Sequence, residues 1–150
     1  MRLNLIEEKL ADLDYEKAPG FLMNGLEREE IIAMNSMILH ELFFDGLVDE
    51  SEPGALSKTR LPEISARGGG ADWVLLSWSP HDRKLANQWA ADHCHMLAGG
   101  IPILALDMYE HSYHMDFGTK AASYADTFMS AIRWTNADQL FSEVGRDAGI

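Results

Sequence analysis

Cysteine is nearly missing from this chain, which has 150 residues and a single Cys, Cys94. One thiol cannot form an internal disulfide framework, and it cannot build a thiolate-rich zinc or iron–sulfur site. Disulfides are typical of proteins that work in oxidising compartments, whereas free thiols are typical of the cytosol. The cysteine content therefore favours a cytoplasmic protein.

Positive charge and long apolar runs are also scarce. The 12 Lys and Arg face 24 Asp and Glu, which gives a formal net charge of −12. Nucleic acid and anionic membrane surfaces would be repelled at long range, so we expect neither as a partner. The longest apolar run, Ile101–Leu106, is too short to cross a bilayer. The acidic start around Glu7 and Glu8 is unlike a signal peptide, and this gives no indication of export.

What is present is an ordinary globular composition. Hydrophobic residues make up 47% and charged residues 24% of the chain, which argues against wholesale disorder. A chain of this length can bury one core, either as one compact domain or as two small layers that share it. We therefore expect a folded protein.

Helical periodicity dominates the first third of the chain. Apolar residues from Leu3 to Leu13 recur with acidic residues between them, which predicts an amphipathic helix that ends before Pro19. A broad apolar stripe predicts a second helix from about Glu27 to Leu47. Stretches 49–54 and 67–70 have loop composition. We therefore predict an N-terminal helical hairpin domain, residues 1–52, and a C-terminal α/β domain, residues 53–150.

Strand signals open the C-terminal part. Short segments rich in aromatic and branched residues are separated by turn residues such as Ser79-Pro80 and Gly99-Gly100. The predicted strands are Trp73–Trp78, Leu85–Ala91 and Ile101–Leu106. Helical stretches follow at about 119–132 and 136–144. The predicted fold class is α+β: an N-terminal α-helical hairpin layer, then an α/β layer with a three-stranded antiparallel sheet flanked by helices.

Asp107 and His111 form the densest candidate site. Asp107 follows the last predicted strand and His111 comes four residues later, so a helical turn between them would bring both side chains to one face. This is a spacing that suits metal ligands. The more frequent reading of the pattern alone is structural, with Asp107 capping a turn and His111 paired in the core.

Two other histidines need an explanation. His40 lies on the apolar helix between Leu39 and Leu42, where an unpaired imidazole would cost free energy, so it requires either a hydrogen-bond partner or a metal. His93 follows Asp92 near a predicted strand end. It is either a site residue or an exposed loop histidine.

Three segments, taken in order, carry a family resemblance. Asp107–Tyr113 resembles the signature Asp-x-Trp-Glu-His-Ala-Tyr of the iron/manganese superoxide dismutases, with Tyr109 for the usual Trp and Ser112 for Ala. His40–Leu47 is similar to the segment of the family that contains a ligand His. Gly70–Leu76 resembles the Gly- and Trp-containing strand of that family. As a fourth match, Tyr124, Phe128 and Trp134 fall where the family has the spaced aromatic residues of its last helices. The resemblance extends from about Leu26 to Val144.

The resemblance implies a site and an activity. One Fe or Mn ion per subunit would be held by His40, Asp107 and His111, and would exchange electrons with superoxide to give dioxygen and hydrogen peroxide. Trp73 and Tyr109 would line the apolar wall of the site. His93 matches the branch of the family that places a His beside the metal, in a position that tunes its redox potential.

The resemblance also implies a homodimer. Glu110 matches the family residue that hydrogen-bonds the ligand His of the other subunit, and Tyr113 matches another residue of that interface.

The chain departs from the family at its first ligand, because no His precedes His40. Leu3-Asn4-Leu5 resembles the segment that follows the missing His, so we expect an N-terminally truncated member. Three readings follow: a superoxide dismutase, a catalytically impaired member that keeps the fold and dimer as a metal-binding or structural protein, and a non-haem iron enzyme with open coordination positions.

Overall fold

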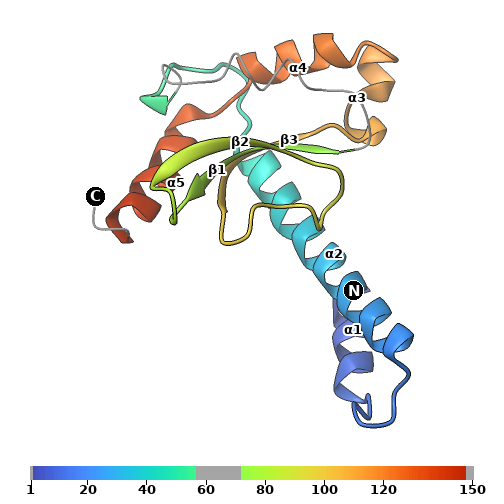
Figure 1. Ribbon diagram of the computed structural model, residues 1–150. Helices are drawn as coiled ribbons and strands as arrows, with labels where there is room; N and C mark the ends of the chain where they lie inside the picture. Colours follow the sequence, from blue (N-terminus) through green and yellow to red (C-terminus); the bar gives the residue numbers. More distant parts are fainter. Residues whose placement is uncertain (1, 57–71, 148–150) are drawn as a thin grey trace.

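The computed structural model describes residues 2–56 and 72–147. A pair of helices, α1 (Arg2–Ala11) and α2 (Gly20–Asp45), projects from a body that contains the sheet and the remaining helices (Figure 1). The glycine-rich stretch 67–70 and the first two residues of the Gly70–Leu76 motif lie outside the described residues. In the part of the chain that is described, no helix combines the length and apolarity needed to span a bilayer.

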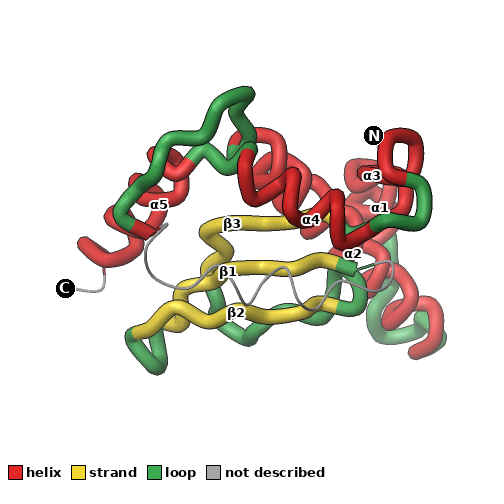
Figure 2. Tube along the Cα trace, turned by 90° about the horizontal axis from the view of Figure 1, so that it is seen from above, coloured by secondary structure: helices red, strands yellow, loops and turns green. Residues whose placement is uncertain are grey.

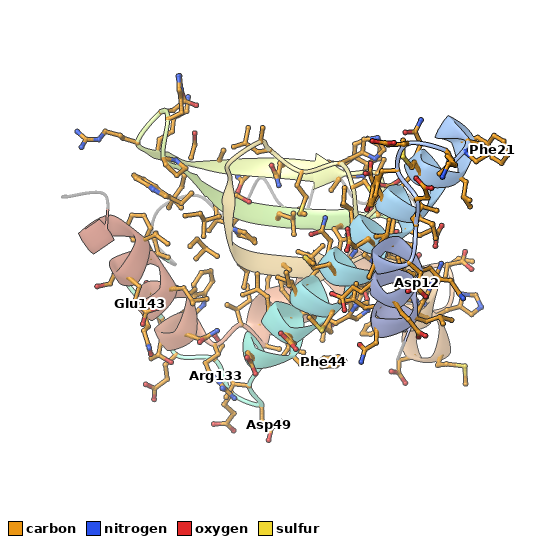
Figure 3. The ribbon with its side chains drawn as sticks, turned by 90° about the horizontal axis from the view of Figure 1, so that it is seen from below. Asp12, Phe21, Phe44, Asp49, Arg133 and Glu143 are labelled. Atoms are coloured by element: carbon orange, nitrogen blue, oxygen red, sulfur yellow. The ribbon has the colours of Figure 1, made fainter. Side chains whose placement is uncertain are left out.

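The long helix α2 connects the hairpin to the body. Ile6 and Leu10 of α1 are buried, and Leu39 and Phe43 near the end of α2 enter the main core. Figure 3 labels Phe21 and Phe44, which lie near opposite ends of this helix and are both exposed. α2 therefore extends from the tip of the hairpin into the core of the body.

The predicted bounds of this helix were wrong at both ends. It begins at Gly20 rather than Glu27, because Pro19 has a φ of −61° and an extended ψ of 136°, which places it just before the first turn. It ends at Asp45 rather than Leu47. The amide of Gly46 closes it by donating to the carbonyl of Leu42, and the amide of Leu47 donates to the carbonyl of Phe44.

The sheet confirms the predicted three antiparallel strands. β1 (Trp73–Ser79) lies in the middle, between β2 (Lys84–Ala90) and β3 (Ile101–Asp107) (Figure 2). Every residue of β1 is buried, as expected for a central strand with both faces covered. The register places Trp73 opposite Asp107, so the start of β1 and the end of β3 lie at the same end of the sheet.

Helices α3 (Glu110–Phe117), α4 (Ala121–Ser130) and α5 (Trp134–Asp147) follow the sheet. The latter two correspond to the predicted helices, with ends shifted by two or three residues. α3 was missed as a separate helix because its apolar pattern is weak, with Tyr113 as its buried residue. The α+β fold class is confirmed.

Candidate metal centre

Three side chains from three elements converge at the end of the sheet where β3 finishes. Asp107 is the last residue of β3, His111 lies in the first turn of α3, and His40 comes from the core-facing end of α2. One ligand atom of each lies within 4.8 Å of the other two. Nε2 of His111 is 3.1 Å and Nε2 of His40 is 3.4 Å from Oδ2 of Asp107. The fold thus brings His40 together with Asp107 and His111, which come 67 and 71 positions later in the sequence.

The tautomer of His40 is fixed by the helix that carries it. Nδ1 of His40 lies 2.6 Å from the carbonyl oxygen of Ser36. Because a carbonyl can only accept, Nδ1 carries the proton, and the lone pair of a neutral His40 is on Nε2. Two acceptors, this Nε2 and the Asp107 carboxylate, therefore face each other. A cation between them would satisfy both, so this donor set fits iron or manganese.

Asp107 is held rigidly. Its side chain is 2% exposed, and Oδ1 accepts a hydrogen bond from the Tyr109 amide at 2.9 Å. Its backbone carbonyl accepts from the hydroxyls of Tyr124 and Ser112, each at 2.8 Å. Burial raises the pKa of the Asp107 carboxyl, because desolvation disfavours the charged form. A bound cation would offset that cost.

Tyr124 contributes to the site in a way that the sequence analysis did not predict. Burial raises the pKa of its hydroxyl to about 12, so it remains a neutral donor to Asp107 at neutral pH. In the sequence it is only one of several spaced aromatic residues. Nothing local indicates that its hydroxyl reaches back 17 positions to the end of β3.

Trp73 forms an apolar wall beside the three side chains. It is completely buried, and its ring meets the His40 ring edge-on at a centroid separation of 5.0 Å. The rings of His93 and Tyr109 lie 5.8 Å and 6.3 Å from Trp73. Aromatic surface of this kind excludes water, which strengthens electrostatic interactions nearby.

His93 lies against this wall, partly buried, rather than free in solvent. Its Nδ1 is 3.3 Å from the Tyr109 hydroxyl, and its ring is 6.3 Å from that of His40. Burial, followed by the neighbouring His40, lowers the pKa of His93. Its Nε2 is buried and has no hydrogen-bond partner among the described residues. Buried polar atoms are almost always hydrogen-bonded in folded proteins, so this atom is available to a partner beyond the described residues.

A cavity of about 440 Å³ reaches this region from the side of the hairpin. Ser36, His40 and His93 line its inner part, and Arg2 lines it from α1. On the α3 side the centre is open, because the His111 side chain is 64% exposed. Of the three remaining histidines, His81 and His95 pair with Asp82 and Asp92, and His114 is exposed on α3.

Comparison with known proteins points to one family. Residues 56–140 match the family model of the C-terminal domain of iron/manganese superoxide dismutases. The chain is 52% identical to a superoxide dismutase [Fe] of Cupriavidus metallidurans, over 97% of this chain and 82% of the relative. It is 28% identical to a superoxide dismutase [Fe] of Aquifex pyrophilus, over 95% and 76%. It is 24% identical to a superoxide dismutase [Mn/Fe] of Propionibacterium freudenreichii subsp. shermanii, over 93% and 79%.

Proposed function

The chain belongs to the iron/manganese superoxide dismutase family, and we propose that it disproportionates superoxide to dioxygen and hydrogen peroxide with one bound iron or manganese ion per subunit. The observation that supports this most strongly is the convergence of His40, Asp107 and His111 within 4.8 Å at the end of β3.

These three residues would hold the ion. Imidazole and carboxylate together suit iron and manganese, and the proton on Nδ1 of His40 leaves its Nε2 free to bind. The bound ion supplies a reversible one-electron couple. The overall charge of −12 disfavours anions, but a cation at this site would give the local positive field that a small anion such as superoxide needs.

We assign the surrounding residues to the control of water and protons. Trp73 and Tyr109 exclude bulk water from one side of the ion. A neutral His93 has one N–H and one lone pair, so it can exchange a hydrogen bond with Tyr109 at Nδ1 while Nε2 remains available to the substrate or its solvent. Reduction of superoxide to peroxide consumes protons, and we assign the delivery of one of them to His93.

The proposal predicts an activity that requires both the bound metal and the His111 side chain. We expect the purified chain, once reconstituted, to hold about one iron or manganese ion and to consume superoxide. His111→Ala should lose at least about 90% of both, since loss of a metal-site residue costs about 10–100-fold in affinity or activity. Metal analysis and stopped-flow decay of superoxide measure the two quantities. His81→Ala is the matched control, because that side chain is 96% exposed. Equal rates in wild type and His111→Ala would refute the assignment.

We further propose that two chains form a homodimer through Glu110 and Tyr113 and that the protein works in the cytosol. The exposure of His111 supports the dimer, because a partner surface would close the open side of the site. Glu110 is exposed beside it on α3, and the single cysteine is in keeping with a cytosolic protein.

Glu110→Ala is expected to weaken the dimer at least about tenfold, because it would leave a charged or polar partner in the interface unpaired. Sedimentation velocity over a concentration series measures the change. Glu143→Ala, at an exposed glutamate on α5, should leave the dimer intact. A wild-type chain that remains monomeric at the highest concentration would overturn the dimer proposal.

A further inference from the structure

The loop of residues 91–100, between β2 and β3, carries His93 without the support of a helix or strand. Within the loop, the His95 amide donates to the Asp92 carbonyl at 3.3 Å and the Gly100 amide to the Leu97 carbonyl at 2.9 Å. Neither bond involves His93. A side chain on such a loop keeps a fixed position only if other elements hold the loop.

Asn35 of α2 supplies one such contact. Its Nδ2 donates to the backbone carbonyl of His93 at 2.5 Å, across 58 positions of sequence. Asn35 precedes Ser36, whose carbonyl sets the tautomer of His40. One short stretch of α2 therefore fixes both the backbone of His93 and the orientation of His40.

A second contact lies two helical turns earlier on α2. Nη2 of Arg28 is 3.2 Å from Oδ2 of Asp92, and Oδ1 of Asp92 accepts from the Cys94 amide at 2.6 Å. The Arg28 side chain is 59% exposed, and exposed ion pairs contribute little free energy in water. Asn35, which is partly buried, is therefore the stronger of these two contacts with α2. The loop is also held from β2, because the Leu97 amide donates to Oε1 of Gln88 at 3.0 Å, but that contact lies four residues away from His93.

The ring of His93 depends on this placement of its backbone. Its contact with the Tyr109 hydroxyl is already 3.3 Å long, so a movement of about 1 Å would break it. The same movement would displace the buried Nε2 of His93, which has no partner among the described residues, and would change the stacking of its ring on the His40 ring, whose centroid lies 6.3 Å away.

We propose that Asn35 is a positioning residue for the superoxide site: by holding the His93 carbonyl, it keeps the His93 imidazole against Trp73 and Tyr109 with Nε2 available to the site. This inference rests on the proposed function and extends it to a residue on a different layer of the molecule. Asn35 does not touch the ion or the substrate, and it acts through His93.

The test uses Asn35→Asp, which keeps the side-chain shape and replaces the donor by an oxygen that faces the carbonyl. In the metal-loaded full-length chain, we expect kcat to fall about tenfold with the metal content unchanged. The midpoint potential should shift in the same direction as in His93→Ala. Asn24→Asp, at an exposed position of the same helix, is the matched control.

The same substitution made in the His93→Ala variant distinguishes a positioning role of Asn35 from a general structural role. When His93 is already alanine, Asn35→Asp should change neither kcat nor the midpoint potential, because there is no imidazole left to position. A further loss of similar size in that background would overturn the inference. So would a kcat and a potential that remain at wild-type values in Asn35→Asp alone.

A metal-free readout distinguishes failure of this inference from failure of the proposed function. Long-range proton–nitrogen NMR of the metal-free chain reports the two ring nitrogens of His93. We expect the Nδ1 resonance to move in Asn35→Asp as the Tyr109 contact is lost. If wild-type protein loaded with iron or manganese consumed no superoxide, the proposed function would fail. The NMR result would still decide whether Asn35 positions the His93 imidazole, because an unchanged Nδ1 resonance in Asn35→Asp would refute that inference.

Discussion

Asp107→Asn is expected to abolish metal binding while leaving the fold intact. Asp107 is the one carboxylate of the candidate centre, and Nε2 of both His40 and His111 faces its Oδ2. Without the negative charge, the ion loses the ligand that neutralises it, so we expect less than about a tenth of the wild-type metal content and activity lowered at least about 100-fold. Elemental analysis and the rate of superoxide decay measure both.

The fold should survive this change because the other contacts of Asp107 do not need a charge. The amide oxygen can still accept from the Tyr109 amide, and Tyr124 and Ser112 bind the backbone carbonyl. Removal of a buried charge also removes a desolvation cost. The metal-free variant should therefore unfold at a temperature no lower than the metal-free wild type. Asp126→Asn, at an exposed position of α4, is the control. Full metal content in Asp107→Asn would contradict the ligand assignment.

Trp73→Ala is expected to cost about 3–5 kcal/mol of unfolding free energy, as for other large buried aromatic residues. Trp73 is completely buried, lies on the central strand and packs edge-on against His40 at 5.0 Å. Its loss leaves a cavity between α2 and the sheet, which a close-packed core cannot fill without moving His40. Urea denaturation of the metal-free proteins measures the change.

Two comparisons make this result informative. Phe21→Ala removes an aromatic side chain that is 82% exposed, and it should change the unfolding free energy by less than about 0.5 kcal/mol. Trp73→Phe keeps an aromatic ring in the core, so it should fold even if the alanine variant does not, and its activity should fall because water enters beside the ion. Similar losses for Trp73→Ala and Phe21→Ala would show that the wall is not part of the core.

The parts of the fold that depend on local pattern could be predicted from the sequence. The aromatic and branched residues of β1 and the turn after Ser79 are local signals, and both led to the observed antiparallel pairing. The start of α2 at Gly20 was missed because the segment after Pro19 contains two glycines, Gly20 and Gly25, and Asn24, which are poor helix formers. These weaken the helical pattern, while packing against α1 compensates for them.

In the candidate centre, too, the features that follow from local sequence pattern were predicted and those that depend on tertiary packing were not. Asp107 and His111 are separated by one helical turn, so their proximity follows from spacing once α3 begins at Glu110. The contacts of Asn35 with His93 and of Tyr124 with Asp107 join residues 58 and 17 positions apart. No periodicity encodes such contacts, because they arise only when the helical layer packs on the sheet. The supporting residues were therefore missed, although the three candidate ligand side chains were predicted from the resemblance.

The central claim is that the ion held by His40, Asp107 and His111 carries out superoxide disproportionation. The most direct test is the rate of superoxide decay measured at several degrees of metal loading, from metal-free to saturated chain. The account predicts a rate that rises in proportion to bound iron or manganese and falls to the uncatalysed value in the metal-free chain. A rate that does not depend on the amount of bound metal would contradict it.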